Sequence, residues 1–198
     1  VRFINAQSKL GLREKPMLLM EFHGSEASVK EQAETVQAIT AETGGEDFQW
    51  ASTPEERTRL WTARHKAYFA GMTQNPGCRT VTTDTCVPIS RLAEIIDASV
   101  VEADASGLPY YIVGHVGDGN FHLAYLVEDG DAAQRDAAEA MSLRMVQRAI
   151  ALEGTCTGEH GIGLHKMGLL GEEAGDGAVE LTRQIKRALG PENIRNPG

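Results

Sequence analysis

The sequence predicts an α+β domain with a ferredoxin-like antiparallel sheet, helices packed on one face and a further helical segment at the C-terminus. Three observations support this fold class. Strand-like and helix-like segments alternate along the chain, residues 110–127 have the pattern of a β-hairpin, and the segments are of mixed length. We find no internal repeat and no low-complexity linker in the sequence.

The first third of the chain contains two expected strands and two expected helices. The apolar run "MLLMEF" (17–22) has strand length, and "DFQWAS" (47–52) is the second expected strand. Between them, Ser25 is the expected N-cap of an amphipathic helix that ends at Gly44 and Gly45. The next helix is expected over residues 53–72, with Thr53 as N-cap, a proline at the first helical position and two glutamates in the first turn.

The remainder of the chain predicts the sheet and its helices. Residues 78–88 are rich in threonine and valine and predict a strand that Pro88 closes. Apolar residues at helical spacing predict helices over 89–107 and 131–154, on either side of the 110–127 hairpin. A glycine-rich loop, "GTCTGEHGIG", follows, and a last helix is expected over about 176–189, stopped by Gly190 and Pro191.

Composition excludes several function classes. With 198 residues the chain can form one large domain or two small ones, and 41% hydrophobic residues suit a globular protein. The net charge of −9 argues against nucleic acid and anionic membranes as partners. We find neither an apolar run long enough for a transmembrane segment nor a signal segment. Three cysteines without metal-type spacing favour reduced thiols in a cytosol-like compartment.

The stretch "GHVGDGNFH" (114–122) places two histidines on either side of a predicted turn. If Asp118 and Gly119 form a two-residue type I′ turn, His115 faces His122, and Val116 and Phe121 point into the core. Opposed residues on one face have Cβ atoms about 4.5–5.5 Å apart, so two imidazoles there can converge on one divalent ion. A solvated or hydrogen-bonded histidine pair explains the same pattern, and the spacing alone leaves both interpretations open.

The loop "GTCTGEHGIG" (154–163) offers a third ligand. Neither it nor the hairpin has the spacing of a dinucleotide fingerprint or a P-loop, which argues against a phosphate site. Glu159 and His160 are adjacent, and in an extended segment one side chain can bind a metal while the other faces a substrate. A His-His-Glu set leaves coordination positions open, as catalytic metal sites require. The alternative is a helix C-cap followed by a loose loop.

Five ordered motifs resemble one family. "EFHGS", "LWTARH", "TDTCVPISRL", "GHVGDGNFH" and "GTCTGEHGIG" are similar to the C-terminal region of FAD-linked D-2-hydroxyacid dehydrogenases of the vanillyl-alcohol oxidase flavoprotein superfamily. The resemblance is strongest to the cytochrome-type D-lactate dehydrogenases and extends over residues 1–198. It implies that the chain is the substrate-binding cap domain, and that the N-terminal FAD-binding domain of the family is absent from it.

The resemblance also implies roles for individual residues. His115, His122 and Glu159 match the ligands of a divalent metal, zinc or manganese, and His160 matches the active-site base. Arg64 in "LWTARH" matches the arginine that holds the substrate carboxylate. The substrate is therefore expected to contact Arg64, His115, His122 and His160 on a polar, solvent-exposed face that closes over the flavin. Asp84 and Lys166 lie inside matched motifs, and we expect only structural pairing for them.

These matches imply the oxidation of a small 2-hydroxy acid to a 2-keto acid. Hydride would pass to FAD, the metal would act as a Lewis acid on the hydroxyl, and His160 would take its proton.

The expected partners are an FAD domain in cis or in trans and an electron acceptor such as cytochrome c, a quinone or another flavoprotein. The location would be cytoplasmic or peripheral to the respiratory membrane, and mitochondrial in a eukaryote. Without flavin the chain should be colourless and inactive. Two other classes remain open, a stand-alone metallohydrolase and a non-catalytic metal-binding module.

Overall fold

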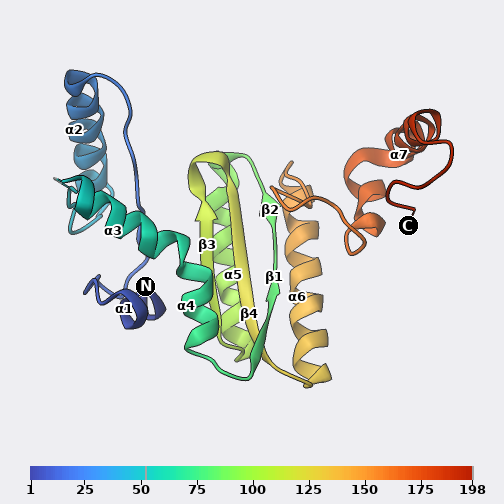
Figure 1. Ribbon diagram of the computed structural model, residues 1–198, viewed down its shortest axis with the longest axis horizontal. Coiled ribbons are helices and arrows are strands. Elements are labelled where there is room, and N and C mark those ends of the chain that lie inside the picture. The colour runs from blue at the N-terminus through green and yellow to red at the C-terminus, as the bar shows by residue number, and fades with distance from the viewer. Residues whose placement is uncertain (52, 198) are drawn as a thin grey trace. The chain divides into compact units, whose positions relative to one another are not determined.

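The computed structural model describes residues 1–51 and 53–197. The chain divides into two compact units, Val1–Gly71 and Met72–Gly198. Figure 1 labels the helices and strands of both units.

The first unit is helical. It contains α1 (Arg2–Ser8), α2 (Glu26–Glu42) and α3 (Pro54–His65), and the short α4 (Ala67–Thr73) includes the boundary between the units. The predicted N-caps of α2 and α3 are confirmed, because the Ser25 side chain accepts from Ser28 N and Thr53 forms a full capping box with Glu56. These helix starts are fixed by signals that lie within the first turn of each helix.

The two strands expected in the first unit do not form. Residues 17–22 and 47–51 have no regular secondary structure, and Ser52 lies outside the described residues. A strand needs a partner whose backbone groups complete its hydrogen bonds, and an apolar run of strand length does not supply one. The side chains of Met17, Leu18, Met20 and Trp50 are accordingly exposed.

The second unit is built on a four-stranded antiparallel sheet with β4 (Asn120–Glu128) at its centre. β1 (Cys78–Thr82) and the short β2 (Thr85–Cys86) both pair with one edge of β4, and β3 (Tyr110–His115) pairs with the other. Beyond β2, a single antiparallel bridge joins Cys86 to Thr155. The order β-β-α-β-β-α, from β1 to the helix that follows β4, and the central position of β4 confirm the predicted α+β class.

Two long helices and one face of β4 form the core of this unit. α5 (Leu92–Ser106) ends at Gly107, and α6 (Ala132–Ala151) begins at the N-cap Asp131, both close to the predicted limits. Alternate residues of β4 pack into one apolar cluster with Ile95 of α5 and with Met141 and Met145 of α6. They are Phe121, Leu123, Tyr125 and Val127. The period of two in β4 therefore leaves His122 on the opposite face of the strand.

The C-terminal helix α7 (Leu170–Leu189) begins earlier than predicted, directly after a 3₁₀ turn over Met167–Leu169. Its backbone breaks at Gly175, where φ is 78° and ψ is 156°. Glycine disfavours helix, so the glycines at the start of this segment conceal its first turns from sequence reasoning. Among the described residues, no helix is long and apolar enough to cross a membrane.

Candidate metal and proton-transfer site

The hairpin that carries the two histidines has a wider turn than predicted. Val116–Asp118 form a 3₁₀ turn, Gly119 has a φ of 75°, and His115 pairs with Asn120 rather than with His122. The predicted opposition of His115 and His122 is therefore wrong. Gly119 O accepts from Val87 N at 3.0 Å, which ties the tip of the turn to the end of β2.

The error in register does not separate the two histidines. Because the register differs from the prediction by two residues, His115 and His122 remain on the same face, now diagonally, with ring centroids 6.1 Å apart. Phe121 is fully buried as predicted, whereas Val116 lies in the turn and is 38% exposed instead of entering the core.

His122 has one tautomer fixed by its surroundings. Its Nδ1 lies 3.2 Å from the carbonyl oxygen of Thr83, which can only accept, so Nδ1 carries a proton. Its Nε2 lies 2.9 Å from Oε1 of Glu159. In the neutral imidazole Nε2 carries a lone pair, so this nitrogen and the Glu159 carboxylate are both able to bind a metal ion.

Glu159 and His160 both reach His122. Oε1 of Glu159 also lies 3.6 Å from Nε2 of His115. The ring of His160 stacks on that of His122 with centroids 4.9 Å apart, and its Nε2 lies 3.8 Å from Glu159 Oε1. The expectation that the two adjacent side chains point in opposite directions is wrong, because residues 158–160 bend rather than extend.

The bend lies against the carboxylate of Asp84, a residue between β1 and β2. Its carboxylate accepts from the backbone N–H groups of three consecutive residues, Gly158, Glu159 and His160. Burial of Asp84 opposes its ionisation, but these bonds and those from the Asn120 and Thr157 side chains outweigh it. They hold the pKa of the carboxyl well below its ordinary value.

Two groups of side chains have the separation that a metal ion needs. In each group the ligand atoms all lie within 4.8 Å of one another. One group is His115, His122 and Glu159, and the other is Asp84, His122 and His160. The oxygens of Asp84 are already engaged by hydrogen-bond donors, which leaves them unsuited to a metal. The His-His-Glu group fits better, since imidazole and carboxylate ligands suit zinc and tolerate manganese.

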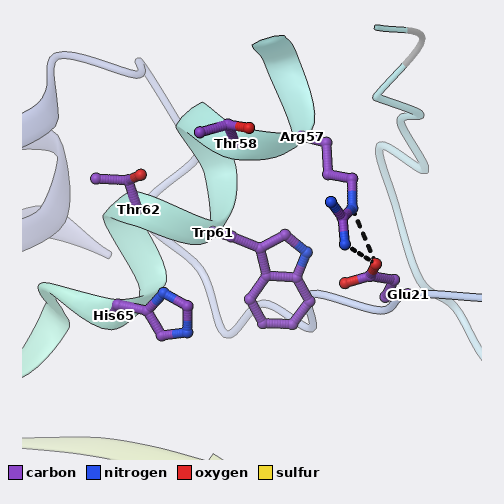
Figure 2. Close-up of a pocket in the computed structure, with 6 residues that line it drawn as sticks. All are labelled: Glu21, Arg57, Thr58, Trp61, Thr62 and His65. Carbon is purple, nitrogen blue, oxygen red and sulfur yellow. Dashed lines mark hydrogen bonds and ion pairs between the residues drawn. The ribbon is translucent and has the colours of Figure 1, made fainter. Parts of the chain in front are cut away.

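Arg64 lies on α3 in the first unit, where it is half-buried. That unit contains a concavity of about 440 Å³ beside α3, shown in Figure 2. Its lining does not include Arg64, and its one arginine, Arg57, is paired with Glu21 through Nε at 2.9 Å. The role of Arg64 in substrate binding remains a prediction.

Sequence reasoning identified part of the group that supports the site. The structural pairing expected for Asp84 and Lys166 is confirmed, because Lys166 Nζ donates to the Asp84 carbonyl at 2.8 Å and lies 3.7 Å from its carboxylate. The contributions of Thr83 and Asn120 were missed. The available signal was an aspartate inside a buried strand segment, "TVTTDTCV", because a charge there requires several partners.

Comparisons with known proteins agree with the resemblance seen in the motifs. The family described as "FAD linked oxidases, C-terminal domain" matches residues 1–198. The chain is 44% identical over 98% of its length to a probable mitochondrial D-lactate dehydrogenase of Danio rerio, and 42% identical over its whole length to the mitochondrial D-lactate dehydrogenase [cytochrome] of Arabidopsis thaliana. It is 31% identical over 98% of its length to the glycolate oxidase subunit GlcD of Bacillus subtilis. The chain covers 39%, 35% and 42% of these three relatives.

Proposed function

The chain belongs to the family of FAD-linked oxidase C-terminal domains, and from this we propose that it is the substrate- and metal-binding part of an FAD-dependent D-2-hydroxyacid dehydrogenase. The proposed reaction is the oxidation of D-lactate, or of a close analogue, to the 2-keto acid. The names of the relatives support this substrate class, since they are D-lactate dehydrogenases and glycolate oxidase subunits. None of these three is a hydrolase, and a stand-alone metallohydrolase has no support.

One observation carries the proposal: three side chains converge on His122 within a single unit. The carboxylate of Glu159 lies 2.9 Å from Nε2 of His122 and 3.6 Å from Nε2 of His115. The ring of His160 stacks on the ring of His122. We propose His115, His122 and Glu159 as the ligands of a zinc or manganese ion. When bound, such a metal would supply a Lewis acid at the substrate hydroxyl, and FAD would supply a hydride acceptor.

His160 is the proposed base. Its imidazole is 56% exposed, so a substrate can reach it, and its stacking on His122 keeps it beside the proposed metal ligands. A histidine imidazole can accept the hydroxyl proton as a general base. Arg64 is proposed to hold the substrate carboxylate, because a guanidinium can pair bidentately with it.

The partners follow from the same proposal. The FAD would be held mainly by a separate FAD-binding domain, in cis or in trans, and electrons would pass to cytochrome c, a quinone or another flavoprotein. Because the relatives from Danio rerio and Arabidopsis thaliana are named mitochondrial, we propose a mitochondrial location in a eukaryote. In a bacterium the protein would be cytoplasmic or peripheral to the respiratory membrane.

The test is metal-dependent oxidation of D-lactate by the complete protein. Reduction of an artificial dye acceptor is measured together with elemental analysis, before and after treatment with a chelator. We expect activity to fall at least tenfold when the metal is removed and to return with zinc or manganese. Full activity of a metal-free preparation would refute the metal site, and absence of activity with every small D-2-hydroxy acid would refute the substrate class.

A further inference from the structure

We propose that Asp84 is a positioning residue of the site, whose carboxylate holds the segment Thr157–His160 in the bend that brings Glu159 and His160 to His122. The anchoring itself is independent of the proposed function. Only its consequence for metal binding and turnover rests on that function.

The carboxylate of Asp84 is surrounded by hydrogen-bond donors of the segment Thr157–His160. Oδ2 of Asp84 accepts from the backbone N–H groups of Gly158 and His160 at 3.0 and 2.9 Å. The N–H of Glu159 is shared between both carboxylate oxygens at 3.2 and 3.1 Å. The hydroxyl of Thr157 donates to Oδ2 at 3.0 Å. Consecutive N–H groups that converge in this way form an anion-binding concavity, and here the anion belongs to the protein itself.

The carboxylate of Asp84 has no free acceptor position for a metal ion or a substrate. A carboxylate has about four lone-pair directions, and five different donors already occupy those of Asp84. Its side chain is only 2% exposed, which keeps substrate and solvent away from it. Asp84 therefore acts through the segment that it holds, and not as a base or a metal ligand.

Through a hydrogen bond from Asn120, Asp84 also joins the segment to β4, the strand that carries His122. Asn120 on β4 donates from Nδ2 to Oδ1 of Asp84 at 3.0 Å and to the carbonyl of Thr85 at 3.0 Å. His122 lies two residues along β4 on the same face. Asp84 thus fixes the loop and the strand relative to each other, and with them the 2.9 Å approach of Glu159 to His122.

The close approach of the segment's backbone to Asp84 requires a glycine at position 158. A Cβ at this position would lie 1.7 Å from Nδ2 of Asn120 and 2.8 Å from Oδ1 of Asp84. Only a residue without a side chain lets the backbone come close enough for its N–H groups to reach the carboxylate. The glycine and the aspartate are two parts of one arrangement.

The experiment compares Asp84→Asn with wild type in the complete protein. Asparagine has the same shape, but it replaces one acceptor oxygen with an NH₂ group that faces backbone donors. We expect amide hydrogen exchange in residues 158–160 to accelerate at least tenfold while β4 and α6 keep their protection. We also expect the affinity for zinc, measured by competition with a chromophoric chelator, to fall about 10–100-fold, the range typical of residues that orient metal ligands.

Glu173→Gln is the matched control. Glu173 also accepts a loop N–H, that of Cys156 at 2.7 Å, whereas the N–H groups of residues 158–160 donate to Asp84. The control should accelerate amide hydrogen exchange at Cys156 alone, and its affinity for zinc should stay within about threefold of wild type. In the active enzyme at saturating metal, Asp84→Asn should lower kcat at least tenfold and change KM less than threefold, because the proposed carboxylate contact, Arg64, belongs to the first unit and makes no use of the segment that Asp84 holds.

Unchanged exchange of residues 158–160 in Asp84→Asn would overturn the proposal. So would equal acceleration of exchange in β4 and α6, since that would indicate general destabilisation. If Asp84→Asn fails to fold, Gly158→Ala decides: selective opening of the segment supports the proposal, and wild-type exchange refutes it. A wild-type protein that binds no zinc or manganese would refute the proposed function, and the exchange data would still test Asp84.

Discussion

The His122 imidazole donates from Nδ1 to the carbonyl oxygen of Thr83 across 3.2 Å, and this bond directs its Nε2 toward Glu159. A histidine ligand whose second nitrogen is held in this way has its tautomer and its ring plane set in advance. The side chain of His122 is only 13% exposed, which makes it the most buried of the proposed metal ligands.

We expect His122→Ala to lower the affinity for zinc at least 100-fold, because His122 is the member of the group that contacts Glu159 directly. His165→Ala is the control, as His165 is an exposed histidine of the same unit and belongs to neither group of potential ligands. Competition titration with a chelator gives both affinities. Equal affinities in the two variants would contradict the assignment.

His160→Ala separates the base from the ligands. If His160 takes the hydroxyl proton, the variant should lose about 10²–10⁴-fold in turnover, the usual contribution of a general base. Its metal content should remain that of wild type, because the His-His-Glu group does not include His160. Dye-linked turnover and elemental analysis on the same preparation check both statements. A parallel loss of metal and activity would make His160 a ligand.

Gly119 should be indispensable to the hairpin, and Gly117 should not. Gly119 has a φ of 75°, and a Cβ there would lie 2.0 Å from the carbonyl oxygen of Val87. Gly119→Ala should therefore cost about 2–3 kcal/mol of unfolding free energy, from the strained backbone and the displaced strand end. A Cβ on Gly117 meets no atom within 4 Å, so Gly117→Ala should stay within about 0.5 kcal/mol. Urea unfolding of both variants tests the contrast.

The elements that were predictable from sequence are those with local signals. The capping box at Thr53, the N-cap Ser25 and the apolar periodicity of α5 and α6 act within one or two turns. Their helices are found where expected, except that the helix expected over 53–72 is divided at Lys66 into α3 and α4. Residues 17–22 and 47–51 had only apolar content as a strand signal, and a strand depends on a partner elsewhere in the chain.

The site was predictable in its residue types but not in its geometry. The period of two in a strand kept His115 and His122 on one face even though the turn type was misjudged. The bend of residues 158–160 was not predictable, because it depends on Asp84, more than seventy positions away in the sequence. Hydrogen bonds between a side chain and backbone N–H groups far away in the sequence produce no periodic pattern of residue types.

The thiol of Cys156 should be unreactive in the folded protein. Cys156 is fully buried, and burial together with its hydrogen bond to Glu173 raises the pKa of the thiol to about 11. At pH 8 only about one molecule in a thousand would carry a thiolate, so iodoacetamide should label Cys156 far more slowly in native than in unfolded protein. Mass spectrometry of time points, with and without urea, measures the two rates. Comparable rates at pH 8 would contradict the buried position.

The same pKa predicts how stability changes in alkali. The folded state holds the Cys156 proton more tightly than the unfolded chain, whose thiol has a pKa of about 8.5. The stabilisation is therefore complete below that pH and is lost progressively as the pH rises toward 11. Cys156→Ala removes this titration, so the difference in unfolding free energy between wild type and variant should shrink from pH 8 to pH 10.5. Urea unfolding at these two pH values is the measurement, and a difference that stays constant or grows would show that the folded-state pKa of Cys156 is not raised.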